Sequence, residues 1–194
     1  AQWNYVIKPR TDPNDPAFSL QWTVERIGVP KVWDITTGGV TARGDTIVLA
    51  ILDSGFDINH EDLSSNVWRN RFEIPGNGLD DDGNAYADDV TGWNFINNTA
   101  VHIPDAHGTS VAGIAGAKGD NSIGVAGINW NVKLMLLATG NVADVIEAYD
   151  YVIVQRDRYN QTGGTAGAFV VATNASFGRE KQFCSEQPVW GPMY

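Results

Sequence analysis

Three long apolar runs alternate with polar, helix-like segments along this chain. Residues 46–52, 132–138 and 167–175 form these runs, and glycine, asparagine or aspartate lies at or beside an end of each. Runs of this length and composition predict strands that are buried on both faces, as in parallel sheets. A shorter strand is expected within residues 89–95.

The clearest helix is expected over residues 142–159. Asn141 stands before it in the position of an N-terminal cap, and Gly163 and Gly164 end the segment. The predicted inner face consists of residues spaced by four, three and four positions: Val145, Tyr149, Val152 and Arg156.

The remaining segments complete the pattern of an α/β protein. Residues 107–118 predict a second helix, and residues 22–35 predict a short helical entry that includes Pro30. Residues 1–20 are expected to form an extended arm, and residues 57–89 a long loop rich in turn residues. Strands that alternate with helices favour a three-layer fold, a parallel sheet with helices on both faces.

Composition and charge narrow the classes of function. The chain has 194 residues, is 43% hydrophobic and carries a net charge of −10. This acidity argues against nucleic acid as a partner, and no run approaches the roughly 18 apolar residues of a membrane span. The negative charge fits a secreted protein, and it also fits carboxylates that gather to bind cations. The start at Ala1 is compatible with an arbitrary boundary or with N-terminal processing.

Cysteine usage is minimal. Cys184 is alone in the sequence, so no disulfide can form within these 194 residues. Its thiol is either free or paired with a cysteine outside the sequence.

Two residues carry the strongest signal for catalysis. Asp53 directly follows the apolar strand 46–52, and His107 opens a run of small residues, HGTSVAG. An acid at the carboxyl end of a strand can orient an imidazole, and a neutral imidazole is a suitable general base for serine near pH 7. The alternatives are a turn aspartate in Asp-Ser-Gly and a structural histidine. His60 and His102 lack any comparable context.

Four segments together resemble the subtilisin-like serine proteases, the subtilases. They are QWTVERIGVPKVW at 21–33, ILDSGFDINHEDL at 51–63, HGTSVAGIAGA at 107–117 with NSIGVAG at 121–127, and ATNASFG at 172–178. One departure is Ser110, which stands where this family often has histidine.

The resemblance implies that residues 1–194 are the N-terminal portion of one subtilisin-like catalytic domain, incomplete at its C-terminal side. Asp53 and His107 are then the catalytic acid and base of a serine endopeptidase. The family's nucleophilic serine and oxyanion asparagine are expected beyond Tyr194. The chain alone is therefore predicted to be inactive. Its expected partners are a peptide or protein substrate and the C-terminal remainder, from the same precursor or as a nicked second chain.

The resemblance also implies two substrate-binding edges. Ser176, Phe177 and Gly178 correspond to backbone that pairs with the substrate strand and walls the specificity pocket. Gly140, after the strand 132–138, marks the second edge. A peptide bound between two such edges would be held as a strand. The alternative is an ordinary core strand.

A calcium site that joins the N-terminal arm to two loops is implied in the same way. Hard cations prefer carboxylate and carbonyl oxygens. The matching positions are the side chains of Asp15, Asp62 and Asn121 and the carbonyls of Lys118, Ile123 and Val125.

The acidic segment 80–89 predicts a second calcium site. Its oxygen-bearing residues alternate as in a calcium loop: Asp80, Asp82, Asn84, the Tyr86 carbonyl and Asp88 or Asp89. It differs from an EF-hand because Ala85 replaces the glycine and Thr91 stands where the bidentate glutamate belongs. Five carboxylates in ten residues would repel one another without a cation. The alternative is a solvated acidic turn.

Two other functions remain open. One is a subtilase-fold protein that binds peptide or calcium without catalysis, and the other is a calcium-stabilised structural module. An intact Asp53 and His107 argue against the second, because folding does not require that pair.

Overall fold

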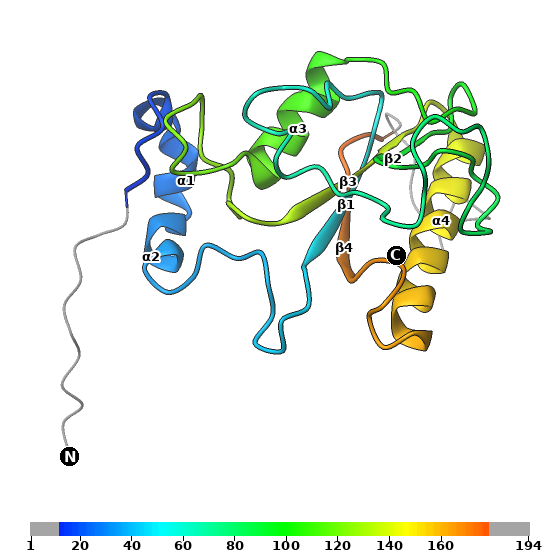
Figure 1. Ribbon diagram of the computed structural model, residues 1–194. Coiled ribbons are helices and arrows are strands. Elements are labelled where there is room, and N and C mark those ends of the chain that lie inside the picture. The colour runs from blue at the N-terminus through cyan, green and yellow to red at the C-terminus, as the bar shows by residue number, and fades with distance from the viewer. Residues whose placement is uncertain (1–11, 179–194) are drawn as a thin grey trace, which may run out of the picture.

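A four-stranded parallel sheet lies at the centre of the computed structural model, which describes residues 12–178 (Figure 1). The strand order is β2-β3-β1-β4, and all three pairings are parallel. The strands are β1 (Val48–Asp53), β2 (Gly92–Asn94), β3 (Lys133–Ala138) and β4 (Val170–Ala175). The expected strands are confirmed in kind. β1, β3 and β4 begin two, one and three residues later than the apolar runs 46–52, 132–138 and 167–175, and β2 lies within the expected range 89–95.

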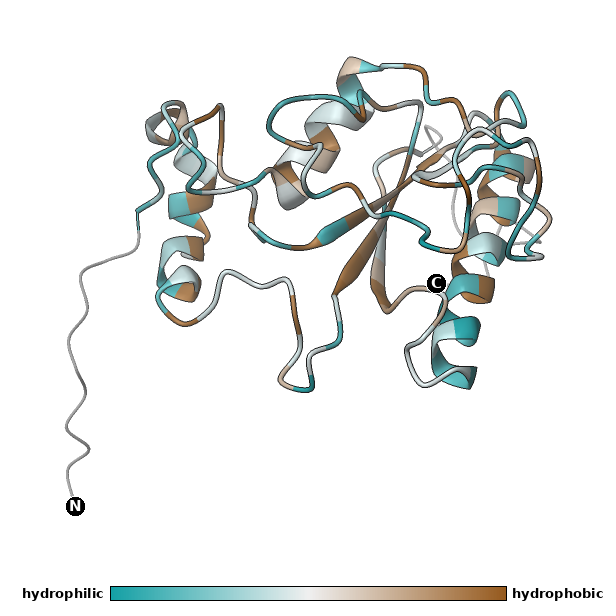
Figure 2. Cartoon of the chain, viewed as in Figure 1, coloured by the Kyte–Doolittle hydropathy of each residue, from teal (hydrophilic) through white to brown (hydrophobic). Residues whose placement is uncertain are grey.

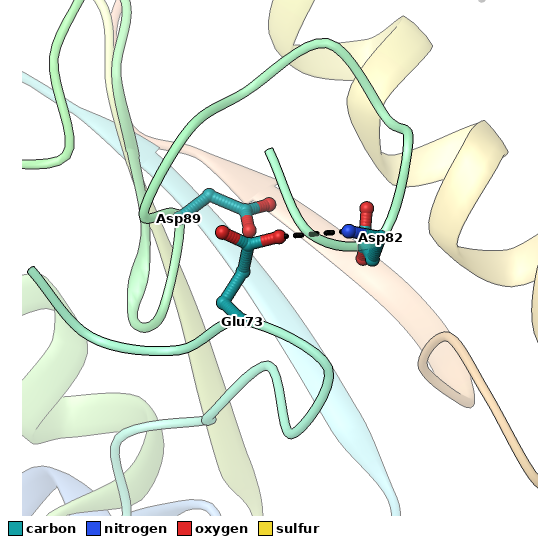
Figure 3. A group of neighbouring side chains, drawn as sticks. All are labelled: Glu73, Asp82 and Asp89. Atoms are coloured by element: carbon teal, nitrogen blue, oxygen red, sulfur yellow. Dashed lines mark hydrogen bonds between the residues drawn. The ribbon is translucent and has the colours of Figure 1, made fainter. Parts of the chain in front are cut away.

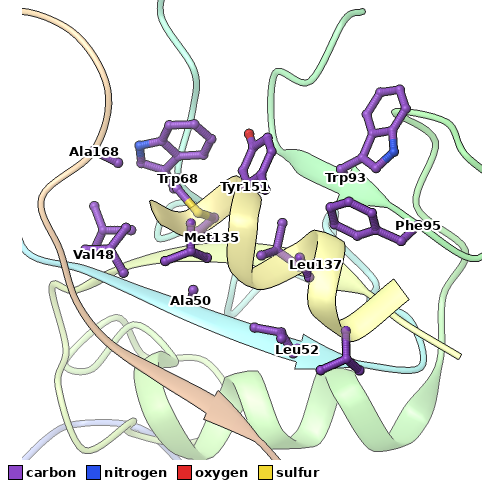
Figure 4. Packing of buried hydrophobic residues seen from close by; sticks show 14 residues of the cluster. Val48, Ala50, Leu52, Trp68, Trp93, Phe95, Met135, Leu137, Tyr151 and Ala168 are labelled. Carbon is purple, nitrogen blue, oxygen red and sulfur yellow. The ribbon is translucent and has the colours of Figure 1, made fainter. Parts of the chain in front are cut away.

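Helices cover both faces of this sheet, which confirms the predicted three-layer α/β fold. Side chains of β1 alternate between two cores. Ala50 and Leu52 join the cluster that includes α4 (Val142–Gln161), whereas Ile51 joins the cluster that includes α3 (Ala106–Gly116). Figure 4 shows the α4 side of the sheet, with Tyr151 of α4 among the labelled residues of the first cluster. In Figure 2, β1 is largely apolar, whereas α4 carries a mixture of polar and apolar residues.

The inner face of α4 differs from the prediction. Val145 and Val152 are buried as expected, but the other buried positions are Ala148, Tyr151 and Gln155. Tyr149 and Arg156 are only partly buried. The buried stripe therefore follows the spacing i, i+3, i+7 and i+10 from Val145, with Tyr151 beside it.

The expected single entry helix over 22–35 is two short helices, α1 (Trp22–Arg26) and α2 (Val29–Trp33). They are separated at Gly28, whose φ of 78° lies in the left-handed region that glycine adopts readily. A 3-10 turn, η1 (Phe18–Leu20), ends the described part of the predicted arm. Residues 1–11 of that arm lie outside the described residues.

Strand β4 is the end strand of the described sheet. Only its first residue, Val170, is buried, and Val171, Ala172 and Thr173 are exposed. The burial on both faces that the apolar run 167–175 predicted is therefore not seen among the described residues.

Candidate active site

The end of β1 and the start of α3 bring Asp53 and His107 together. Asp53 is the last residue of β1 and is 2% exposed, while His107 lies in the first turn of α3. A Cβ on Gly108 would come within 2.2 Å of the Gly55 carbonyl oxygen. The glycine therefore allows the first turn of α3 to lie directly against the turn that follows Asp53.

The two side chains form one hydrogen-bonded pair. Nδ1 of His107 lies 2.8 Å from Oδ1 of Asp53. The pKa of His107 is raised above its ordinary value. The hydrogen bond to Asp53 is the larger cause, and the negative charge of Asp53 is the next. When Nδ1 carries the proton, it donates to the carboxylate and leaves the lone pair of Nε2 free. The imidazole is 61% exposed, so it is accessible to a reactant.

Two neighbours of this pair, Ser54 and Asp105, were not predicted from the sequence. Ser54 donates its backbone N–H to Oδ1 of Asp53, and its hydroxyl lies near both Asp53 and Asp105. Asp105 caps α3 and accepts from the N–H groups of His107 and Gly108. An aspartate two residues before the histidine, at a helix start, was the sequence signal for this cap.

No serine hydroxyl is hydrogen-bonded to the His107 ring within residues 12–178. Ser110, in the same helix, donates instead to the carbonyl of Ala106. The described residues therefore supply an acid–base pair without a hydrogen-bonded serine.

Both predicted substrate edges lie at the same end of the sheet as this pair. Strands β3 and β4 flank β1, with Ala138 in register with Asp53 and Ala175 in register with Leu52. Gly140 follows β3, and its N–H donates to Asp144 at the start of α4. Ser176, Phe177 and Gly178 follow β4 and are exposed.

The residues predicted for the arm cation site also converge. Asp15 and Asp62 are buried, at 4% and 2% exposure. Asp62 accepts from the Asn121 side chain and the Val125 N–H, and Oδ2 of Asp15 accepts from the Asp120 N–H. Oδ1 of Asp15 is buried and has no hydrogen-bond partner among residues 12–178. Burial, reinforced by the charge of Asp62, raises the pKa of Asp15.

This arrangement fits a hard cation. An orphaned buried carboxylate oxygen beside a second buried carboxylate is costly unless a proton or a cation compensates it. The backbone carbonyls of Lys118, Ile123 and Val125 accept no hydrogen bond among the described residues, so their oxygens are available as ligands.

The carboxylates of the acidic loop fall into two groups, those that order turns and those that converge. Asp80 accepts from the N–H groups of residues 83–85, and Asp88 accepts from those of residues 76–78. Each carboxylate thus orders a turn. The side chains that converge are Glu73, Asp82 and Asp89, with one oxygen of each within 4.8 Å of the others (Figure 3).

Several donors already surround this acidic trio of Glu73, Asp82 and Asp89. Glu73 accepts three backbone N–H groups, and Asp82 pairs with Arg158 at 2.9 Å. Asp89 is fully buried and accepts from Asn70, Asn84 and Tyr151. Burial raises the pKa of Asp89 to about 7. The trio could hold a metal ion, and in its absence these donors stabilise the charge.

The remaining predicted ligands lie close to the trio. Asn84 donates its side-chain N–H to Asp89 and accepts from the N–H of Tyr86. The Tyr86 ring packs edge-on against Trp93, Phe95 and Tyr151. Glu73 was missed because it precedes the acidic segment by seven positions.

This chain is similar in sequence to one known protein family and to several known proteins. The sequence model of the subtilase family matches residues 44–190. Subtilisin-like protease 1 of Plasmodium falciparum (isolate 3D7) is 41% identical over 148 residues, which cover 72% of this chain and 21% of that protein. The Plasmodium berghei (strain Anka) protein of the same name is 37% identical over 149 residues, covering 72% and 24%.

Similarity extends to a bacterial enzyme. Thermitase of Thermoactinomyces vulgaris is 35% identical over 117 residues, covering 59% of this chain and 32% of thermitase. A protease structure from Pseudoalteromonas arctica PAMC 21717 covers 73% of this chain and 44% of that chain, at 24% identity and a TM-score of 0.49. The chain thus spans between about a fifth and a third of the length of the three named relatives.

None of the helices in the described part of the chain combines the length and the apolar character that crossing a bilayer requires.

Proposed function

This chain belongs to the subtilase family, and from that premise we propose that it is part of a serine endopeptidase. The observation that carries the proposal is the 2.8 Å contact between Nδ1 of His107 and Oδ1 of Asp53. In a triad, the aspartate fixes the imidazole tautomer and stabilises the imidazolium, and Nε2 takes the proton of the serine.

The proposed reaction is acyl transfer to water. Nε2 of His107 removes the serine proton as the hydroxyl attacks the peptide carbonyl, and the imidazolium then protonates the leaving amine. Water hydrolyses the acyl-enzyme with the same residue as base. Because the chain covers less than a third of its named relatives, the serine and an oxyanion asparagine are proposed to lie in sequence outside residues 1–194. Residues 1–194 alone are then the N-terminal part of the catalytic domain and inactive.

The substrate is proposed to be a peptide or protein segment bound as an extended strand. Gly140 and the segment Ser176–Gly178 flank the catalytic pair on the strands beside β1. Apart from the Gly140 N–H, which donates to Asp144, their exposed backbone would offer ladder hydrogen bonds on two sides of a peptide, as β-strand addition requires.

Calcium is the proposed cofactor, with a structural role. Asp15, Asp62 and Asn121, with the carbonyls of Lys118, Ile123 and Val125, would hold one ion. The acidic trio, with nearby Asn84, would hold a second, while Asp80 and Asp88 order the loop around it. A bound Ca²⁺ would neutralise buried carboxylates and tie the arm and loops to the sheet. Calcium use and the net charge of −10 agree with a secreted protein.

The test separates the enzyme from a non-catalytic peptide-binding or calcium-binding protein of the same fold. The full-length protein should hydrolyse casein and react with a fluorophosphonate probe at a serine outside residues 1–194. His107→Gln should abolish both, while Asp150→Asn on the exposed side of α4 should abolish neither. A folded full-length protein that reacts with neither reagent would favour the non-catalytic alternative. A polypeptide of residues 1–194 that is fully active by itself would contradict the proposed location of the serine.

A further inference from the structure

A second carboxylate lies beside the Asp53–His107 pair. Asp105 is the N-cap of α3, two residues before His107. Its Oδ1 accepts from the His107 N–H at 2.9 Å and the Gly108 N–H at 3.3 Å. As a cap it satisfies helix N–H groups, but its position also brings a full negative charge to the turn that carries the imidazole.

Ser54 connects this carboxylate to Asp53. The Ser54 hydroxyl oxygen lies 2.9 Å from Oδ1 of Asp105 and 3.1 Å from Oδ1 of Asp53. One hydroxyl proton can serve only one of these acceptors at a time. The Ser54 N–H donates to the same Asp53 oxygen at 2.8 Å, so Ser54 contacts the catalytic acid through two groups.

From this chain of contacts we propose that Asp105 is a positioning residue for the Asp53–His107 pair. Its charge stabilises the imidazolium form of His107, and its bond to Ser54 holds the residue that orients the Asp53 carboxylate. The proposal rests on the proposed function, because it assigns a role relative to His107 as the base. It goes further by giving the pair a second acid that comes from the helix rather than from the strand.

The charges around His107 support this role. Among the described residues, those that act on its imidazole are Asp53 from β1 and Asp105 from the cap of α3, and both favour the protonated form. The hydrogen bond from Ser54, with those from the α3 backbone, lowers the pKa of Asp105. Asp105 is therefore ionised wherever His107 titrates. Because the imidazole is exposed, its interaction with Asp105 should weaken as salt is added.

Asp105→Asn isolates the charge from the cap. Asparagine is as good an N-cap as aspartate, so α3 should keep its start while the negative charge is lost. Asp105→Ala removes both the charge and the cap. The difference in stability between Asp105→Ala and Asp105→Asn therefore measures what the cap contributes. Asp150→Asn is the matched control, since it removes one negative charge from an exposed position on α4.

The measurement is the pKa of His107 in the full-length protein, followed in two ways. The acid limb of kcat/KM against pH reports the base of the free enzyme. NMR titration of the histidine ring protons reports the same group without activity, and His107→Gln assigns its resonance. Asp105→Asn should lower the His107 pKa in both, by less than Asp53→Asn does, with a smaller difference at 1 M salt. Asp150→Asn should leave it unchanged.

Two results would overturn the inference in different ways. If Asp53→Asn lowers the His107 pKa but Asp105→Asn leaves it at the parent value, Asp105 is only a helix cap and the catalytic pair stands. If neither substitution moves the His107 pKa, the pairing of Asp53 with His107 fails, and the proposed function fails with it.

Discussion

The edge of the sheet that carries Asp53 and His107 and the acidic loop hold their polar side chains in different ways. Asp53 and His107 project from the end of a central strand and the first turn of a helix, and one 2.8 Å contact joins them. The acidic trio, by contrast, lies in residues 70–90, where α-helix and strand are absent. Its geometry depends on backbone N–H groups and on donors from α4.

The difference shows what regular elements contribute to a site. A strand end and a helix start fix a side chain through the core beneath them, so the pair needs few partners of its own. A loop has no such core and must satisfy each carboxylate locally. Here Tyr151 and Arg158 reach from α4 into the loop and join it to the sheet through the α4 packing. The predictions below test this contrast.

The largest effect is expected from loss of the base. His107→Ala in the full-length enzyme should lower kcat by about 10⁶-fold, the loss measured for the triad base in subtilisin, and Asp53→Asn by about 10⁴-fold. The melting temperature should change little for His107→Ala, because the imidazole is 61% exposed. Steady-state hydrolysis of a peptide substrate and a thermal melt measure the two quantities.

The double variant makes this result sharper. Residues that act as one unit are not additive, so His107→Ala combined with Asp53→Asn should be about as inactive as His107→Ala alone. Losses that simply multiply would mean that the two residues act independently, contrary to the 2.8 Å contact.

Calcium removal should have the next largest effect, and on stability. Ligand that binds only the native state at 100 to 1,000 times its Kd stabilises by about 3–4 kcal/mol per site. A chelator should therefore lower the melting temperature, and Ca²⁺ should restore it better than Mg²⁺. Asp15→Asn should remove the response of the arm site, and Glu73→Gln that of the acidic trio.

The controls separate the two cation sites. Glu147→Gln, on the exposed face of α4, removes the same charge as Glu73→Gln and should keep the full calcium response. Asp80→Ala with Asp82→Ala should affect the acidic loop while the arm site keeps its ion. Melting curves that are identical before and after thorough chelation would contradict both sites.

The contact between Asp53 and His107 was predictable because its signals are local. Asp53 ends an apolar run and His107 begins a run of small residues, so sequence position alone places them at adjacent element ends. The same logic gave the parallel sheet and its two helical layers. The break at Gly28 was missed because helical propensity on both sides hid a residue in the left-handed region.

The acidic loop was less predictable because its partners are distant in sequence. Alternating oxygens suggested the ligands, but Asp80 and Asp88 are used to order turns, and Glu73 enters from outside the segment. Tyr151 donates to Asp89 across 62 positions. The buried face of α4 was predicted wrongly for the same reason. Tyr149 was expected to be buried, but Tyr151, which donates to the distant Asp89, is buried instead.

The protonation of the buried His102 is coupled to folding. His102 is 9% exposed and packs edge-on against Phe56, and burial lowers its pKa to about 4 from 6.5. The unfolded chain therefore binds more protons between these values. The His102 contribution to stability is complete above pH 6.5 and is lost as pH falls toward 4, by at most roughly 3 kcal/mol.

His102→Gln should flatten this part of the stability curve. Urea unfolding at pH 7 and pH 4.5 measures the difference, and His60→Gln, at an exposed histidine, serves as the control. If the free energy of unfolding falls equally between these pH values with and without His102, the buried imidazole is not the group that titrates.

The smallest effect is expected where α4 supports the acidic loop. The Tyr151 hydroxyl donates to Oδ2 of Asp89 at 2.5 Å inside the core. Tyr151→Phe should cost about 1–3 kcal/mol of unfolding free energy, because a buried carboxylate loses a donor while Asn70 and Asn84 remain. The cost should grow above pH 7, where Asp89 is ionised, and shrink when Ca²⁺ neutralises the trio. Tyr149→Phe on the same helix should change stability by less. Equal effects of the two substitutions, unaffected by pH or Ca²⁺, would mean that α4 does not support the loop through Asp89.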